Sequence, residues 1–197
     1  MNLNPILNQN LFVIKEKTGI LKAANNYDIY DPETNQIIMH CRENNLGFFT
    51  KMLRFTEYKK RTPFNVEITT ASGEKLITVK RGISIINSTV QVLDEKDCLV
   101  GTFKREVFSL GADFEIFDKN GIQCAILDGN WSGWDFTFSH EDKQLAKINK
   151  KWAGVGREFF TTADNYALQI EDNVAADSAI RQLMLGAVVC IDMVLKE

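Results

Sequence analysis

The chain has few of the residues on which metal sites, disulfide frameworks and catalytic centres depend. Its 197 residues include 3 prolines, 4 cysteines and 2 histidines. The cysteines lie far apart and form no C-x-x-C pair, so neither a disulfide framework nor a zinc site is expected, and reduced thiols are the simplest interpretation. The histidines fit no metal-ligand spacing, and no Ser-His-Asp set, nucleotide-binding loop or paired-carboxylate motif occurs, so the sequence predicts no enzyme. The cysteines are Cys41, Cys98, Cys124 and Cys190, and the histidines are His40 and His140.

Signals for secretion, membrane insertion and lipid attachment are missing as well. Residues 1–10 form a short polar lead without the apolar run of a signal peptide, and no Met-Gly start or CaaX ending suggests lipidation. With 23 basic and 26 acidic residues the net charge is -3, so no nucleic-acid partner is expected, and binding to an anionic membrane would require a local patch. We expect a single domain over residues 1–197 in the cytoplasm, with peripheral contact to membranes. The sequence identifies no protein partner.

A repeated hairpin pattern fills most of the chain. Short segments of alternating apolar residues, such as Val66/Ile68 and Phe136/Phe138, are joined by turns rich in Gly, Asn and Asp, which is typical of half-buried strands in hairpins. The expected hairpins are 27–30 with 36–41, 64–70 with 75–80, 89–94 with 98–104, 113–117 with 122–127, and 134–139 with 144–149. Two further strands are expected at 11–15 and 166–170. A dozen antiparallel strands would leave long exposed edges unless the sheet closes, so we expect a barrel.

The last segment has the pattern of a helix. It runs over residues 174–195, with Asp172 or Asn173 as the expected cap. Residues 183–191 are apolar on every face, which is typical of a helix buried on all sides. This run is far shorter than the roughly 20 residues of a membrane span. We therefore expect a helix enclosed by the barrel, with Asp192 requiring a hydrogen-bonding or ionic partner there.

The segment KKWAGVGREFFTTADNY, residues 150–166, resembles the signature of the phospholipid scramblase family. Its order of a tryptophan, a glycine, an Arg-Glu pair, Phe-Thr and Ala-Asp-Asn-aromatic is carried by Trp152, Gly154, Arg157, Glu158, Phe160, Thr161, Ala163, Asp164, Asn165 and Tyr166. The resemblance spans about residues 20–197 and extends to the tubby-like and LURP-one-related domains. It implies a mainly β, tubby-like, twelve-stranded antiparallel barrel enclosing a hydrophobic C-terminal α-helix, and a lipid-binding, membrane-associated role in phospholipid transport.

The same resemblance directs attention to calcium in residues 162–173, with Asp164 and Asp172 as the candidate ligands. Calcium requires six to eight oxygen ligands and a glycine at the sixth loop position. Here Thr162, Ala167 and Asn173 occupy the first, sixth and twelfth positions, and residues 166–170 alternate like a strand. The alternative to a calcium site is that residues 162–173 form a turn, a strand and a helix cap. No cofactor is expected, and strong calcium binding would be a surprise.

The best candidate for lipid binding is a basic stretch interleaved with aromatic residues. Its cations are Lys51, Arg54, Lys59, Lys60 and Arg61. Such a mixture suits anionic phospholipid headgroups, and the alternative is a solvated connection whose aromatics complete the core. The sequence thus favours a phospholipid scramblase-like protein that binds anionic lipid or a membrane surface and assists transbilayer phospholipid movement. The other function left open is a soluble, non-enzymatic scaffold that binds a small apolar ligand or a protein partner.

Overall fold

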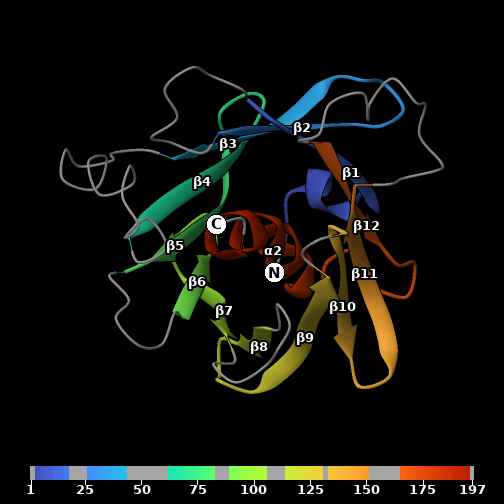
Figure 1. Ribbon diagram of the computed structural model, residues 1–197. Helices are drawn as coiled ribbons and strands as arrows, with labels where there is room; N and C mark the ends of the chain where they lie inside the picture. The colour runs from blue at the N-terminus through green and yellow to red at the C-terminus, as the bar shows by residue number, and fades with distance from the viewer. Residues whose placement is uncertain are drawn as a thin grey trace.

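Twelve antiparallel strands close into a barrel around one long helix in the computed structural model of the chain (Figure 1). The structure describes residues 3–17, 26–43, 62–82, 89–105, 114–130, 133–150 and 165–195. Each strand pairs with its neighbour in sequence, and β1 pairs with β12 to complete the closure. The elements are η1 (Pro5–Asn8), β1 (Leu11–Glu16), β2 (Tyr27–Tyr30), β3 (Ile37–Glu43), β4 (Phe64–Thr70), β5 (Lys75–Arg81), β6 (Thr89–Leu93), β7 (Leu99–Arg105), β8 (Phe114–Asp118), β9 (Gln123–Asn130), β10 (Asp135–His140), β11 (Lys143–Asn149), β12 (Asn165–Ile170) and α2 (Ile180–Leu195).

The expected hairpins and the closed barrel are confirmed. The bounds of β2 and β4 agree with the prediction, and the other strands differ by one to three residues at one or both ends. Alternation decides which side chains face the core: in β4, Phe64, Val66 and Ile68 are buried, whereas Asn65 between them is exposed. The period-2 pattern of the sequence is therefore the pattern of the barrel wall.

Most of the tight turns between paired strands have a similar backbone conformation. Each of the five tight hairpins has a positive-φ residue in its turn and a register shift in the adjoining strand pair. In four of them this residue lies near the end of the turn, as expected for a type I turn followed by a bulge, whereas Glu141 is the first residue of the two-residue turn between β10 and β11. The positive-φ residues are Asn35, Gly73, Asp97, Gly121 and Glu141. In three of the turns, the carboxylate of the aspartate at the start of the turn accepts hydrogen bonds from two backbone N–H groups of the same turn. These aspartates are Asp31, Asp94 and Asp118. The recurring Asp and Gly residues are thus explained by local turn chemistry.

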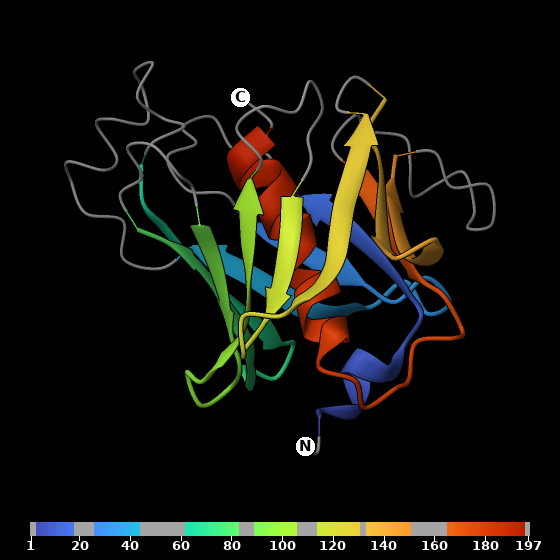
Figure 2. The same ribbon diagram turned by 90° about the horizontal axis from the view of Figure 1, so that it is seen from below.

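The two ends of the barrel differ in how the strands are connected. The five tight hairpins and the connection from β12 to α2 lie at one end, together with the start of the chain, and we call this the turn end (Figure 2). At the opposite, far end, β3 finishes at Glu43, β4 begins at Phe64, and α2 finishes at Leu195. The helix therefore runs along the inside of the barrel from the turn end to the far end.

The enclosed-helix prediction is confirmed. Every apolar side chain in residues 183–191 is at most 2% exposed. Gly186 allows α2 to approach the wall closely, because a Cβ atom built there would lie 2.8 Å from Cγ2 of Val92 on β6. Asp192 has the partner that its burial requires, since the hydroxyl of Tyr27 donates a hydrogen bond to its Oδ2. In the described part of the chain, no helix is long and apolar enough to cross a membrane.

The predicted start of the helix was wrong. The helix begins at Ile180, whereas residues 171–179 form turns, and neither Asp172 nor Asn173 caps it. The guanidinium of Arg181, a residue only 3% exposed, donates to the carbonyl oxygens of Val174 at 2.8 Å and Ala175 at 2.9 Å. Because these carbonyls are bound by a side chain, an additional helical turn is not needed to satisfy them.

Candidate functional site

Most of the site residues predicted from sequence lie outside the described residues. These are the five cations Lys51, Arg54, Lys59, Lys60 and Arg61, together with the candidate calcium ligand Asp164. Along the chain, the cations fall between β3 and β4. Of the signature over residues 152–166, the structure describes Asn165 and Tyr166, which begin β12.

Asp172, the second candidate calcium ligand, is described and lies at the turn end. It is exposed, and its Oδ1 accepts a hydrogen bond from Asn10 Nδ2 at 2.7 Å. The predicted strand over residues 166–170 is present as β12, which spans roughly 20 Å at about 3.3 Å per residue. Asp172 therefore lies just past one end of β12. Asn165, which follows Asp164 in the sequence, lies at the other end of this strand. Within the described residues, no group of three or more His, Cys, Asp and Glu side chains is arranged to hold a metal ion.

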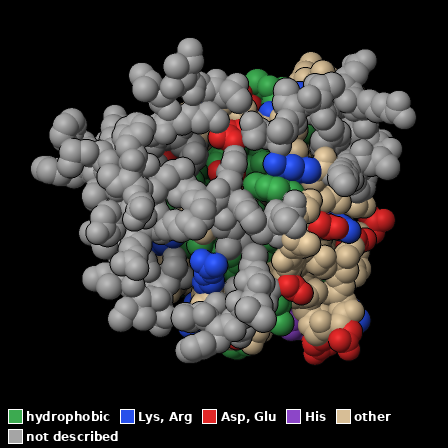
Figure 3. All heavy atoms as spheres, viewed as in Figure 1, with side chains coloured by type: hydrophobic (Ala, Val, Ile, Leu, Met, Phe, Trp, Pro, Cys, Tyr) green, Lys and Arg blue, Asp and Glu red, His purple; other side chains and the backbone are tan. Residues whose placement is uncertain are grey.

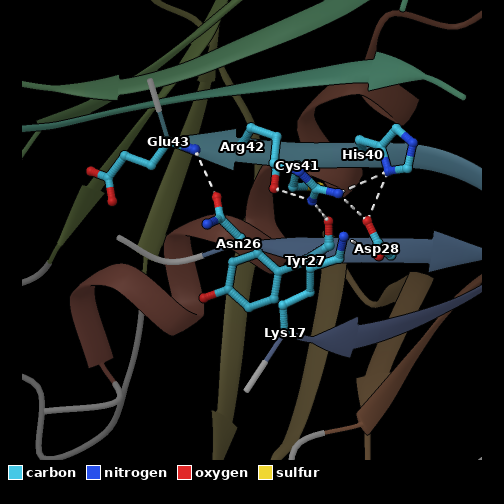
Figure 4. A network of polar contacts seen from close by, with 8 residues as sticks. All are labelled: Lys17, Asn26, Tyr27, Asp28, His40, Cys41, Arg42 and Glu43. Carbon is cyan, nitrogen blue, oxygen red and sulfur yellow. Dashed lines mark hydrogen bonds and ion pairs between the residues drawn. The ribbon is translucent and has the colours of Figure 1, made fainter. Parts of the chain in front are cut away.

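A cluster of charged side chains covers the outer wall of β1, β2 and β3 (Figure 4). At its centre is Asp28 of β2, a carboxylate whose side chain is only 4% exposed. Its Oδ2 lies 3.0 Å from Lys17 Nζ, and its Oδ1 lies 2.8 Å from His40 Nδ1 and contacts Arg42 Nη2. Arg42 also donates through Nη1 to the carbonyl oxygens of Tyr27 and Cys41. We call Lys15, Lys17, Asp28, His40 and Arg42 the wall cluster.

Alternation explains why these side chains meet on the outside. Tyr27 and Ile29 point into the core, so Asp28 between them points outward, and its register partners in the sheet are Lys15 on β1 and His40 on β3. Burial alone would raise the pKa of the Asp28 carboxyl, but hydrogen bonds from Arg42, His40 and Lys17 outweigh burial and hold the pKa below its usual value. Asp28 is thus ionised at neutral pH and fixes its cationic neighbours.

The wall cluster carries more positive than negative charge. Three permanent cations, Lys15, Lys17 and Arg42, surround the single carboxylate of Asp28, and Glu67 of β4 lies opposite Arg42 in the sheet register. Lys15 Nζ lies over the ring of Tyr30, 4.3 Å from its centroid. The ammonium-bearing side chain of Lys17 is 54% exposed. An exposed cation, Lys17, near a half-buried one that lies over an aromatic ring, Lys15, is an arrangement that suits an anionic headgroup.

The turn end, in contrast, is strongly acidic. The connections at this end (residues 31–36, 71–74, 94–98, 119–122, 141–142 and 171–179) contain eleven acidic residues and two basic ones. Removing them from the 26 acidic and 23 basic residues of the chain leaves 15 acidic and 21 basic residues elsewhere. The residues are Asp31, Glu33, Glu74, Asp94, Glu95, Asp97, Glu141, Asp142, Glu171, Asp172 and Asp177, with Lys96 and Lys119. On the face in Figure 3, acidic side chains gather at the lower right, where Figure 1 places the β10–β11 hairpin. A chain of net charge -3 therefore has one acidic end and a basic remainder.

Sequence reasoning missed the wall cluster because its members come from three strands. From the sequence, His40 was assigned no role, because it fits no metal-ligand spacing. A signal was nevertheless present: Lys15 and Lys17, and likewise His40 and Arg42, are spaced two residues apart and so share the outer face of their strands. Pairing each strand with the next would have placed Asp28 between the two basic pairs.

Comparisons with known proteins agree on family and fold. The model of the Scramblase family matches residues 6–197. The chain is 24% identical to a Saccharomyces cerevisiae protein called altered inheritance rate of mitochondria protein 25, over 92% of this chain and 64% of that protein. It is 23% identical to a phospholipid scramblase family protein of Schizosaccharomyces pombe, over 92% of this chain and 51% of that protein. The chain thus spans between about half and just under two thirds of the length of these relatives.

Two further matches complete the comparison. Human phospholipid scramblase 2 is 35% identical over 36% of this chain and 23% of its own length. The crystal structure of a protein from Arabidopsis thaliana superimposes with a TM-score of 0.53 at 14% identity, covering 95% of this chain and 97% of that one. This likeness concerns the fold alone.

Proposed function

Because this chain belongs to the Scramblase family, we propose that it binds anionic phospholipid headgroups at a membrane surface and assists transbilayer phospholipid movement. The observation that carries the proposal is the separation of charge between the acidic turn end and the basic remainder of the chain. An anionic bilayer repels the turn end and attracts the surface that bears the wall cluster. The names of the human and Schizosaccharomyces pombe relatives, both of which contain the words phospholipid scramblase, support phospholipid as the substrate class.

The positions of the cations indicate how the barrel is oriented on the membrane. Lys17 directly follows β1 and Arg42 is the penultimate residue of β3, and both strands end at the far end. The sequence between β3 and β4 adds the five basic residues from Lys51 to Arg61. Each Lys or Arg near an anionic membrane contributes about 1 kcal/mol, and the contribution falls off within a Debye length of about 8 Å at physiological salt. We therefore expect peripheral, electrostatic binding with the turn end directed away from the bilayer.

Cosedimentation with vesicles tests this proposal. Vesicles of phosphatidylcholine with 30% phosphatidylserine (a composition of about one anionic lipid in three) should bind the protein at about 50 mM salt and release it at about 500 mM, whereas pure phosphatidylcholine should bind poorly at both. The triple substitution of Lys59, Lys60 and Arg61 by Gln and the double variant Lys15→Gln/Lys17→Gln should each weaken binding severalfold. A fluorescent-lipid assay on the same vesicles then measures transbilayer movement with and without the protein.

A matched control removes the same number of positive charges at a different place on the barrel. Lys96→Gln/Lys119→Gln removes the same two charges from the turn end, where both side chains are exposed. This control should bind vesicles as wild type does. Equal losses from both double variants would mean that only net charge matters and would refute the proposed surface. If the wild type binds no vesicle at all, the scaffold function takes its place.

A further inference from the structure

The imidazole of His40 in the wall cluster has one nitrogen bound to a carboxylate and the other directed outward. Its Nδ1 lies 2.8 Å from Asp28 Oδ1, and an ionised carboxylate accepts only, so Nδ1 carries the proton of this hydrogen bond. Arg42 Nη2, 3.0 Å from the same Nδ1, is itself bound to Asp28 Oδ1 and does not require Nδ1 as an acceptor. Nε2 is therefore the basic nitrogen of the ring. Figure 4 shows this second nitrogen on the side of the ring away from Asp28 and Arg42, and the side chain is 30% exposed.

Proton uptake at Nε2 adds a charge and an outward N–H donor to the barrel wall. Histidine is the side chain that ordinarily changes charge between about pH 5 and about pH 8. Despite its burial, the pKa of the Asp28 carboxyl is held below its usual value by its hydrogen bonds, so Asp28 stays ionised over this range. The carboxylate therefore keeps the imidazole in place while the outer nitrogen gains or loses its proton.

The charges that face His40 decide what this proton changes. In the described part of the chain they are two acidic and three basic side chains from four neighbouring strands, and the register partner of His40 on β4, Thr69, is uncharged. The charged groups are Asp28 of β2, Glu67 of β4, Arg42 of β3, Lys15 of β1 and Lys17, which directly follows β1. Their net charge is one positive charge while His40 is neutral and two once it is protonated. Proton uptake thus doubles the positive charge that this surface presents to an anion.

We propose that His40 is a proton-dependent contact for the phosphodiester of an anionic phospholipid. The inference rests on the proposed function, to which it adds a binding residue and a pH dependence. The protonated Nε2–H donates a charge-assisted hydrogen bond to a phosphodiester oxygen, beside the ammonium of Lys17, which is bound to the other oxygen of Asp28 and is 54% exposed as a side chain. The neutral ring has a lone pair at Nε2 and repels that oxygen. Lipid binding and proton uptake therefore strengthen each other.

Cosedimentation at two pH values tests the contact. Vesicles of phosphatidylcholine with about 30% phosphatidylglycerol are suitable, because the phosphodiester of phosphatidylglycerol stays ionised and its headgroup has no other titrating group. At the same salt concentration, the wild type should bind about fivefold more tightly at about pH 5.5 than at about pH 8, which is the effect of one added cation near an anionic surface. His40→Gln should bind at both pH values as the wild type does at the higher one. His40→Arg, with a permanent charge, should bind at both as the wild type does at the lower one.

The second histidine of the chain provides the matched control. His140 is exposed and ends β10 at the turn end, so His140→Gln should keep the fivefold difference. Wild-type binding that is equal at both pH values, or a pH difference that survives in His40→Gln, would overturn the contact and leave the proposed function standing. Absence of binding at both pH values would overturn the two together.

NMR of the imidazole nitrogens separates lipid contact from a histidine that only stabilises the wall. Long-range ¹H–¹⁵N spectra at about pH 8 should show the proton of His40 on Nδ1. Saturating short-chain phosphatidylglycerol should move the titration midpoint of His40 upward by about 0.7 pH units, the equivalent of a fivefold change in affinity, and leave that of His140 unchanged. A proton on Nε2 at high pH, or a midpoint of His40 that the lipid does not move, would contradict the proposal.

Discussion

The contact between Gly186 of α2 and Val92 of β6 provides a direct test of how the helix sits in the barrel. A Cβ atom added at Gly186 would lie 2.8 Å from Val92 Cγ2, while the next nearest atoms, on Val79 and Val92, are at 3.6 Å. One methyl group of one side chain therefore opposes the substitution. Gly186→Ala should destabilise the protein because Val92 is fully buried and held in the barrel wall.

The magnitude follows from two opposing effects. Replacing a helical glycine by alanine favours the helix by about 1 kcal/mol. Inserting a methyl group into a packed core costs about 1–3 kcal/mol, so the net loss in Gly186→Ala should be up to about 2 kcal/mol. Val92→Ala alone should cost about 1–2.5 kcal/mol, since it removes two buried methyl groups and leaves a cavity. In the Val92→Ala background the clash is gone, and Gly186→Ala should now stabilise by up to about 1 kcal/mol.

The assay is a double-mutant cycle by urea denaturation. The two substitutions should couple by about 1–3 kcal/mol, with Gly186→Ala changing from destabilising to stabilising when Val92 is shortened. Gly82→Ala serves as the control, because a Cβ atom there has no neighbour within 4 Å and no positive φ to strain it. Additivity of the Gly186 and Val92 substitutions within about 0.5 kcal/mol would show that α2 does not pack against β6 in this register.

Burial and charge decide three other experiments. Leu185→Asp should abolish cooperative folding, because Leu185 is 1% exposed and an unpaired buried carboxylate outweighs the marginal stability of a domain; a wild-type Tm would contradict this. A thiol reagent should modify exposed Cys98 in the native state and reach Cys41 and Cys190 only after unfolding, since burial raises the pKa of Cys41 to about 12 and raises that of Cys190 as well; four equal rates by mass spectrometry would refute it. Asp28→Asn should lower the free energy of unfolding by about 1–3 kcal/mol at pH 7. Because the folded-state pKa of Asp28 is lowered, this difference should persist above about pH 4 and disappear as the pH falls through that pKa; a difference unchanged at pH 2.5 in urea titrations would contradict the ion network.

Local chemistry explains how much of the fold was predictable. Each tight hairpin is encoded by a few adjacent residues, such as Asp118 at the start of its turn and Gly121 at the positive-φ position. Strand alternation is equally local, and it predicted the inward residues of β4 without any knowledge of its neighbours. Closure then followed from the number of strands. The enclosed helix was predictable because residues 183–191 are apolar on every face.

Features that depend on distant parts of the chain were not predictable in this way. The helix starts at Ile180 because Arg181 binds carbonyl groups from residues 174–175 and also from Leu7 and Gln9, more than 170 positions away. The wall cluster requires the register of three strands, and the pocket lined by Leu7, Leu76 and Gln182 combines η1, the β4–β5 hairpin and α2. A single sequence contains these residues but not their proximity.

The acidity of the turn end has a structural origin as well as a functional consequence. Asp31 and Asp94 are needed because each carboxylate binds two backbone N–H groups of its own turn. The N–H of Thr34 is the main reason that the pKa of Asp31 lies below its usual value. All five tight hairpins lie at the same end, so the acidic residues of the separate turns together produce a negative electrostatic potential over one end of the barrel. The proposed orientation on a membrane thus arises from the topology of the fold.

The closed barrel also constrains how the proposed contact with lipid could occur. The apolar side chains of residues 183–191 contact a bilayer only if α2 leaves the barrel, because none of them is more than 2% exposed. Its departure would break the hydrogen bond between Tyr27 and Asp192 and empty the core, at a cost comparable to the free energy of unfolding, about 5–15 kcal/mol for most domains. Peripheral cations contribute about 1 kcal/mol each without disturbing any packed residue. The proposed binding is therefore expected to use the outer surface, and the wall cluster is the described part of that surface where we expect it.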